Sequence, residues 1–275
     1  MEFGRASASE PTLRPAGVRR VLAVGSGKGG VGKSTVTVNL AVALAQQGLA
    51  VGLMDADAYG PNIPRMMGVA RLPRPKDGKI QPAEAYGTTL VSIGFMARPE
   101  DPLVWRGPMT DKMVRQFLVD VAWGELDVLF VDLPPSTGDI PISLVKHTQV
   151  DGAVVVVTPQ EVSLDDARKA IGMFRRMEVP VLGVVENMSY FVCTECETPH
   201  YLFGQGGGKR LAESEGLPFL GEIPLEIAIR EGGDGGIPAV LRAGIQAGTA
   251  FQTLAEHLWH RIRPSSVDGD PEQRI

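Results

Sequence analysis

The amino-acid sequence predicts an α/β protein with a doubly wound, mostly parallel sheet flanked by helices. Short aliphatic runs rich in Val and Leu recur along the chain of 275 residues. They lack polar alternation, as expected for strands buried on both faces of a parallel sheet. Helix-length amphipathic segments separate several of these runs, and such alternation favours a parallel sheet. Ligands bind this kind of sheet at the carboxyl ends of its strands.

The predicted elements follow one another without an intervening linker. The strand candidates are VLAV from Val21, LAVGLMD from Leu49, TLVSIGF from Thr89, LDVLFVD from Leu126, AVVVVT from Ala153 and PVLGVVE from Pro180. The helix candidates are Lys33–Gln47, Asp111–Ala122, Leu164–Glu178 and Ile245–Ile262. We therefore predict one domain over 20–263, with a flexible N-terminal tail at 1–19 and a flexible C-terminal tail at 264–275.

The composition argues against several classes of protein. A net charge of -5, with 44% hydrophobic and 21% charged residues, is ordinary for a soluble globular protein. It gives no general reason to expect binding to nucleic acid or to an anionic membrane. The longest aliphatic run, Ala153–Val157, is too short to span a bilayer. The first residues lack the apolar stretch of a secretory signal, and two cysteines make no disulfide framework. We therefore expect a cytoplasmic protein with no nucleic-acid partner and no stable membrane association.

A glycine-rich turn joins the first strand candidate to the first helix candidate. The string GKGGVGKS over 27–34 fits the pattern G-x-x-x-x-G-K-[ST]. Glycines let the backbone wrap a phosphate closely, with N–H groups pointing inward at a helix N-terminus. Lys33 would reach the β- and γ-phosphates, the Ser34 hydroxyl would bind Mg²⁺, and Thr35 would contact the α-phosphate. The predicted nucleotide-binding residues are Gly27, Lys28, Gly29, Gly30, Val31, Gly32, Lys33, Ser34 and Thr35. A turn that binds nothing is the alternative, and the agreement of motif, strand and helix argues against it.

Acidic residues stand at the carboxyl ends of two strand candidates. Asp55 ends LAVGLMD, with Asp57 shortly after it, and Asp132 ends LDVLFVD. An acid in this position beside a phosphate loop can hold metal-bound water, and Mg²⁺ dehydrates reluctantly. Asp132 would therefore bind Mg²⁺ through water. A single Asp is more commonly a turn or cap residue, but acids at two strand ends on the loop's edge of the sheet favour a shared site.

Asn187 follows the strand candidate from Pro180 and suits a nucleobase. Its side-chain amide carries a donor and an acceptor, so it can pair with both N6 and N7 of adenine. The guanine-selecting string N-K-x-D is absent from the chain, which favours ATP over GTP.

Cys193 and Cys196, the two cysteines of the chain, form a C-x-x-C pair that allows four interpretations. Thioredoxin-like redox chemistry places such a pair at a helix N-terminus in a different fold. A structural zinc site needs four ligands, and one chain supplies two thiols with His200 as a candidate third. A buried pair is the third interpretation, although polar neighbours predict exposure. In the fourth, two chains each give two thiolates to a Cys₄ site for a [4Fe–4S] cluster or for zinc.

Lys28 adds a second lysine inside the phosphate loop. The string KGGVGKS resembles the deviant Walker A motif of the P-loop NTPases that include MinD, ParA and the nitrogenase iron protein. This resemblance implies that Lys28 crosses a dimer interface, where a cation can stabilise the charge that develops in phosphoryl transfer. It implies catalytic roles for Lys28, Lys33 and Asp57, the last positioning the attacking water. It further implies a supporting role for Asp55 near the metal and adenine binding by Asn187. A solvated surface lysine is the alternative for Lys28.

A longer series of motifs resembles the Mrp/ApbC family of iron–sulfur carrier ATPases. It comprises GVRRVLAVGSGKGGVGKST, DADAYGPNIP, VWRGPM, DLPPSTGD, VTPQEVSLDDARKA, ENMSYFVCTEC, FGQGGG and GEIPLEIAIREGGDGGIP. The resemblance implies a homodimer that bridges a labile [4Fe–4S] cluster through Cys193 and Cys196 of both subunits. It implies slow ATP hydrolysis that alters cluster loading or release, with apo iron–sulfur proteins as clients. One departure is Ser136, where relatives usually have glycine.

Two other functions stay open on the sequence. One is a positional switch ATPase of the MinD/ParA type, which acts by binding membrane or DNA. The C-terminal segment has few basic residues, and no basic stripe suggests DNA, so both observations disfavour it. The other is a non-carrier ATPase dimer bridged by zinc, since zinc readily occupies thiolate sites.

Overall fold

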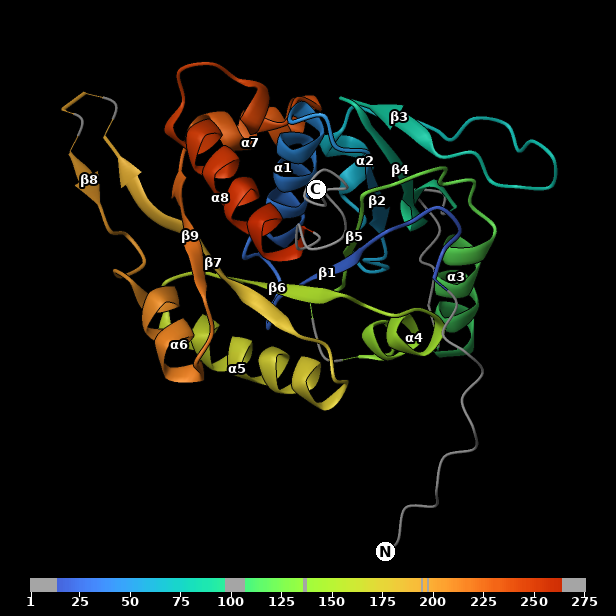
Figure 1. Cartoon of the computed structure of the whole chain (residues 1–275). Helices are drawn as coiled ribbons and strands as arrows, with labels where there is room; N and C mark the ends of the chain where they lie inside the picture. Colours follow the sequence, from blue (N-terminus) through green and yellow to red (C-terminus); the bar gives the residue numbers. More distant parts are fainter. Residues whose placement is uncertain (1–13, 97–106, 136–137, 194, 197, 264–275) are drawn as a thin grey trace, which may run out of the picture.

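The computed structural model describes residues 14–96, 107–135, 138–193, 195–196 and 198–263. Within these ranges, one nine-stranded sheet has the order β3-β4-β2-β5-β1-β6-β7-β8, and β9 also pairs with β7 (Figure 1). The parallel strands are β1 (Val21–Gly25), β2 (Val51–Asp55), β4 (Thr88–Ser92), β5 (Val128–Asp132), β6 (Gly152–Val157), β7 (Val181–Val192) and β9 (Phe219–Leu225). Two short strands are antiparallel to a neighbour, β3 (Ala83–Ala85) to β4 and β8 (Pro199–His200) to β7. The predicted doubly wound, mostly parallel sheet is confirmed.

Helices cover both faces of the sheet (Figure 1). One face carries α1 (Lys33–Gln46), α2 (Ile63–Met66), α7 (Ile227–Gly235) and α8 (Gln246–Ile262). The other face carries α3 (Gly107–Val119), α4 (Asp139–His147), α5 (Glu161–Arg176) and α6 (Gly207–Glu215). Two single 3₁₀ turns, η1 (Ile93–Phe95) and η2 (Ala239–Leu241), complete the described elements. Among the described residues, no helix is long and apolar enough to cross a membrane.

Two hydrophobic cores lie on opposite faces of the sheet. Successive side chains of a strand point to opposite faces, so Leu22 and Val24 of β1 enter one core while Val21 and Ala23 enter the other. This explains the aliphatic runs without polar alternation, because no residue of β1 faces water. Burying each of these Val and Leu side chains contributes about 1.5–3 kcal/mol relative to leaving it exposed.

The helix limits differ from the prediction in one instructive place. The helix predicted at Asp111–Ala122 begins earlier and ends earlier, as α3 over Gly107–Val119. Residues after its end leave the helix because Val121 pairs with Ile80 in an isolated β-bridge. The Ala122 amide also donates to the Ile80 carbonyl at 2.9 Å. A long-range backbone pairing thus ends a helix whose periodicity would have continued.

The chain joins the folded body before the predicted boundary at residue 20. Val18 is buried and pairs with Leu126 in a parallel bridge. Arg14 forms an ion pair with Asp151, with Nη1 and Oδ2 2.8 Å apart. Residues 14–19 therefore belong to the body rather than to a tail. The rest of the predicted N-terminal tail, and the C-terminal tail at 264–275, lie outside the described residues.

Candidate functional site

The phosphate loop lies where β1 ends and α1 begins, at the carboxyl edge of the parallel strands. Its conformation depends on two close approaches by glycine. Gly32 has φ 81 and starts α1, and a Cβ there would lie 2.2 Å from the Asn187 Nδ2 atom. Gly27 lies against α5, where a Cβ would lie 2.1 Å from the backbone carbonyl carbon of Asp166. The loop is thus clamped between β7 on one side and α5 on the other.

We expect Gly27→Ala to destabilise the fold, whereas Gly29→Ala leaves its stability nearly unchanged. The Gly27 Cβ would meet rigid backbone of α5, and overpacking of this kind costs about 1–3 kcal/mol. A Cβ at Gly29 has only the Pro135 ring in ordinary contact, at 3.6 Å, so we expect a change within about 0.5 kcal/mol. Urea unfolding of the nucleotide-free protein measures both values. Equal urea unfolding midpoints for the two variants would contradict the close packing of Gly27 against α5.

Lys33 and Asp132 form the buried centre of the site. The Lys33 Nζ lies 2.8 Å from Asp132 Oδ2 and 3.5 Å from Asp57 Oδ2. Ser34 Oγ donates to the same Asp132 oxygen at 2.6 Å, and Thr37 Oγ1 donates to Asp132 Oδ1 at 2.7 Å. Burial alone would lower the pKa of Lys33, but the charges of Asp132 and Asp57 outweigh it and raise that pKa above its usual value. The ammonium therefore stays charged throughout the neutral range.

Asp55 stands beside Asp132 in the register of the sheet, because β2 and β5 are neighbours and these residues are paired. Burial, together with the negative charge of Asp132, raises the pKa of Asp55 to about 8. Ser92 Oγ donates to Asp55 Oδ2 at 2.8 Å, and the Asp57 amide donates to Asp55 Oδ1 at 3.2 Å. Asp55 therefore shapes the turn that carries Asp57.

Asp57 leads the segment that follows β2 and faces the loop. Its Oδ1 accepts the amides of Tyr59 and Gly60, both at 3.2 Å, while its other oxygen faces Lys33. Burial raises the pKa of Asp57, against the opposing charge of Lys33. Asp57 and Asp132 thus share the single positive charge of Lys33 at this edge of the sheet.

Two hydroxyl residues of this centre were missed by the motif analysis. Thr37 orients Asp132 from one helical turn beyond Lys33, and Ser92 supports Asp55 from the end of β4. Their positions gave a partial signal, since Thr37 follows Lys33 by four residues and Ser92 lies within the strand candidate from Thr89. Only the pairing of β2, β4 and β5 shows which carboxylate each one binds.

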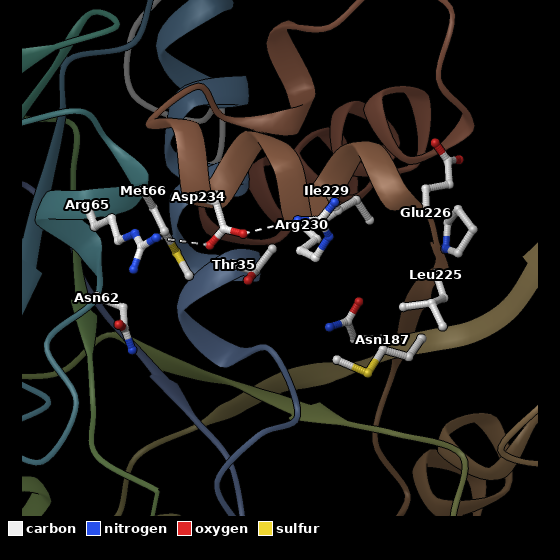
Figure 2. Close-up of a pocket in the computed structure, with 13 residues that line it drawn as sticks. Thr35, Asn62, Arg65, Met66, Asn187, Leu225, Glu226, Ile229, Arg230 and Asp234 are labelled. Carbon is white, nitrogen blue, oxygen red and sulfur yellow. Dashed lines mark hydrogen bonds and ion pairs between the residues drawn. The ribbon is translucent and has the colours of Figure 1, made fainter.

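A cavity of about 300 Å³ adjoins the loop between α2 and α7, and we call it the α2–α7 cavity. Thr35 and Asn187 line it, and Figure 2 shows Thr35 at the start of α1 and Asn187 on β7. Asn187 Nδ2 donates to the Val31 carbonyl at 2.9 Å. This leaves the amide oxygen and the second Nδ2 hydrogen for a ligand.

One ion pair between two helices and one within a helix border the same cavity. Arg65 of α2 lies 3.5 Å from Asp234 of α7, and Arg230 lies 3.3 Å from the other oxygen of Asp234 (Figure 2). These side chains are more than half exposed, so each pair contributes little to stability. They define the outer wall of the cavity, and the motif analysis did not single them out.

The cysteines lie on a hairpin formed by β7 and β8, which extends past the helices at one end of the sheet (Figure 1). Cys193 directly follows β7 and is half-buried, whereas Cys196 is exposed, and both are free thiols. The Cys193 amide donates to the Thr198 carbonyl at 3.0 Å. Hydrogen bonding to Thr198 is the main cause that lowers the pKa of the Cys196 thiol.

This placement decides between some of the interpretations of the C-x-x-C pair. The pair is in a hairpin rather than at a helix N-terminus, which disfavours thioredoxin-like chemistry. Among the described residues, no three His, Cys, Asp or Glu side chains are arranged to hold a metal ion, so His200 does not complete a site with the two thiols. One chain therefore offers two thiolate ligands, with no third ligand among the residues that the structure describes.

A second cavity of about 660 Å³, which we call the cysteine hollow, lies between the end of β7 and α7. Phe191, Cys193 and Ile245 line it. Leu225 and Glu226 line both this hollow and the α2–α7 cavity. The corner where β9 meets α7 is therefore a wall shared by the cavity beside the phosphate loop and the hollow beside Cys193.

Lys28 lies in the loop and lines a small cavity of about 160 Å³ together with Asp57 and Pro135. The Ser26 hydroxyl donates to its carbonyl at 3.0 Å. Ser136, the departure from the usual motif, lies outside the described residues.

A parallel sheet with this loop, a buried lysine and strand-end carboxylates defines the protein as a P-loop NTPase by class. Comparisons with known proteins give the family. The profile described as ParA, NUBPL iron-transfer P-loop NTPase, matches residues 17–259. The chain therefore belongs to the NUBPL iron-transfer P-loop NTPases.

Individual relatives agree with this assignment. An iron-sulfur cluster carrier protein of Deinococcus radiodurans is 49% identical over 278 residues, covering 99% of this chain and 78% of the relative. A mitochondrial iron-sulfur protein of Arabidopsis thaliana, required for NADH dehydrogenase, is 48% identical over 98% of this chain and 88% of its own.

Solved structures of nucleotide-binding proteins share the fold of this chain. A nucleotide-binding protein of Archaeoglobus fulgidus in complex with ADP superposes with a TM-score of 0.72 at 40% identity, covering 82% of this chain and 90% of that one. The cell division ATPase MinD of Pyrococcus furiosus, at 23% identity and a TM-score of 0.64, shares the fold over 88% of this chain and 98% of its own.

Proposed function

We propose that this protein is an ATP-binding and ATP-hydrolysing carrier that transfers a [4Fe–4S] cluster to apo iron–sulfur proteins. Relatives that this chain matches over 78% and 89% of their own lengths carry the name iron-sulfur cluster carrier protein. The observation that carries the proposal is the shared wall. Leu225 and Glu226 border both the α2–α7 cavity, beside the phosphate loop, and the hollow that holds Cys193.

The nucleotide would lie along the loop with its base in the α2–α7 cavity. The loop backbone and Lys33 would hold the phosphates, Thr35 would contact the α-phosphate, and Asn187 would pair with adenine. The relative that contains ADP supports a nucleotide here. Asp57 is placed at the loop rim, where it would orient the attacking water. Lys28 of a partner subunit would add positive charge at the transferred phosphoryl group.

The oxygen donors of this chain fit Mg²⁺. Ser34 Oγ and Asp132 Oδ2 lie 2.6 Å apart, and Asp55 adjoins Asp132. Mg²⁺ prefers oxygen ligands and keeps several waters, so it needs no cage of protein carboxylates. Bound there, it would neutralise charge on the phosphate oxygens. Ser34 would ligate it directly, and Asp132 would hold its water, with Thr37 fixing the orientation of that carboxylate.

The cluster would be cargo shared by two subunits. A [4Fe–4S] cluster takes four thiolates, and Cys193 and Cys196 are the two that one chain offers. A homodimer would supply the other two through its twofold symmetry. Zinc could occupy the same four thiolates in place of the cluster.

The carboxyl edge of the sheet is suited to such a dimer. Exposed apolar side chains gather in segments that follow the parallel strands, at the edge that carries the phosphate loop. These side chains include Tyr59 after β2, Ile142 in α4 after β5, and Val162 in α5 after β6. Exposed apolar groups clustered at one face mark an interaction surface.

We expect Ile142→Asp to weaken self-association by at least about tenfold, because it places a charge in an apolar contact. Ile142 is 57% exposed, so the substitution leaves the core intact. Val119→Asp is the matched control, since Val119 is 43% exposed at the far end of α3, away from the loop edge. Sedimentation with Mg²⁺ and a non-hydrolysable ATP analogue compares them. Equal association of both variants would place the dimer surface elsewhere.

Cluster transfer under nucleotide control tests the proposal. Protein reconstituted without oxygen, using ferrous iron and sulfide, should pass its cluster to an apo [4Fe–4S] acceptor at a rate that differs between ATP and ADP. A coupling of about 1–3 kcal/mol between nucleotide and cluster would change the cluster affinity about 5- to 150-fold, and the ratio of the cluster dissociation constants in ATP and ADP measures it. Failure to take up iron and sulfide, or uptake of zinc alone, would refute the carrier function.

The variant Leu225→Ala tests, in the same cluster-transfer assay, whether the wall formed by Leu225 and Glu226 couples the two cavities. We expect the difference between ATP and ADP to shrink to less than about threefold, because the substitution loosens the packing that both cavities share. Ile245→Ala is the control, since Ile245 lines the cysteine hollow but not the α2–α7 cavity. If both variants keep the full nucleotide effect, coupling runs through another part of the molecule.

A further inference from the structure

Thr198 contacts both cysteines of the hairpin. Its carbonyl accepts the Cys193 amide at 3.0 Å. Its hydroxyl oxygen lies 3.3 Å from the Cys196 sulfur, which donates its S–H to it. The same hydroxyl reaches back to the Cys196 carbonyl at 3.4 Å. One residue thus ties the backbone of the first cysteine to the side chain of the second.

The direction of the contact with Cys196 depends on the state of the sulfur. A thiol can donate to the hydroxyl, but a sulfur that ligates a metal has lost its proton and can only accept. A threonine hydroxyl rotates freely enough to reverse its role and donate. Hydrogen bonds to ligating sulfurs stabilise the anionic sulfur and raise the reduction potential of an iron–sulfur cluster.

We propose that Thr198 is a positioning residue for the cargo, whose hydroxyl donates to the ligating sulfur of Cys196 while its carbonyl holds Cys193 in place. The inference rests on the proposed carrier function and adds a residue outside the C-x-x-C motif to the cluster site. In a homodimer the contact occurs twice around one cluster. Thr198 then sets how tightly the cargo is held, which for a carrier determines how readily it is released.

Thr198→Val tests the hydroxyl alone, because the variant keeps the backbone carbonyl that binds Cys193 and nearly the same shape. Thr198→Ser keeps a hydroxyl and is the rescue control. A hydrogen bond worth about 0.5–1.5 kcal/mol corresponds to about a two- to tenfold effect. In the reconstituted full-length dimer we expect Thr198→Val to lose its cluster to an iron chelator at least about threefold faster. We also expect a more negative midpoint potential, with Thr198→Ser close to the wild type in both measurements.

Cobalt binding provides a readout that does not need the cluster. Co²⁺ bound by thiolates gives a charge-transfer band, and its titration into the reduced apo protein yields a dissociation constant. We expect about threefold weaker Co²⁺ binding in Thr198→Val and wild-type binding in Thr198→Ser. Wild-type values for Thr198→Val in cluster loss, potential and Co²⁺ affinity would overturn the role of Thr198. Should the wild type take up no cluster, the carrier function fails, while the Co²⁺ titration still decides the Thr198 contact.

Discussion

Replacing Cys193 and Cys196 together with Ser is expected to abolish cluster binding. The two thiols are free, and among the described residues no third His, Cys, Asp or Glu is arranged with them to hold a metal. Serine hydroxyls do not replace thiolates for iron–sulfur clusters. Iron and acid-labile sulfide per dimer, measured after reconstitution without oxygen, should fall from about one cluster to background.

The nucleotide side of the molecule is the internal control for this double variant. Neither cysteine belongs to either hydrophobic core, so ATP binding and the unfolding midpoint should stay close to wild-type values. Single variants should lose cluster as well, because each removes two of the four ligands in a symmetric dimer. Full iron and sulfide content in the double variant would show that the cargo binds elsewhere.

Replacing Lys33 with Met is expected to reduce ATP hydrolysis by about 10²- to 10³-fold, the effect of removing one preorganised charge from a phosphoryl or oxyanion site. Lys33 is only 5% exposed and is held between Asp132 and Asp57. A buried cation in this position gives stronger stabilisation to developing phosphate charge than an exposed one would. Phosphate release at saturating ATP measures the loss.

Lys33→Met also leaves buried carboxylates without their counter-charge, so stability must be followed in parallel. Ser34→Ala separates the two effects, because it removes a hydroxyl from Asp132 but keeps the Lys33–Asp132 ion pair. We expect Ser34→Ala to lose ATP hydrolysis and the dependence of nucleotide binding on Mg²⁺, with little change in the unfolding midpoint. Lys169→Met, at an exposed lysine of α5, is the control for loss of a lysine as such. Wild-type turnover in Lys33→Met would refute the assigned role.

Local patterns in the chain were enough to predict the fold class and the outline of the site. Aliphatic runs located β1, β2, β4, β5 and β6, because strands buried on both faces leave no polar alternation. The glycine string located the loop, since few other backbones can turn so tightly between a strand and a helix. The strand-end positions of Asp55 and Asp132 predicted that they would meet, and β2 and β5 pair them directly.

Other elements carried too little local signal to be predicted. β9 contains Gly221 and Pro224, residues that are depleted in strands, and it forms because β7 offers a partner. α7 has the sequence IAIREGGDG, whose glycines weaken a helix, and it packs against α2 and η2, which are distant in sequence or outside its own periodicity. β9 and α7 meet at Leu225 and Glu226, which line both cavities. The part of the molecule that carries the proposed function is therefore the part whose secondary structure the hydrophobic periodicity predicts least well.

The sequence by itself determined a parallel sheet, a phosphate loop and a pair of thiols, because each depends on residues that are close along the chain. Only the tertiary structure decided that Thr37 and Ser92 orient the carboxylates and that α2 and α7 enclose a cavity. It also decided that Leu225 lines both this cavity and the cysteine hollow. These contacts join segments far apart in sequence. Their formation depends on the packing of the sheet and its helices, which no local pattern encodes.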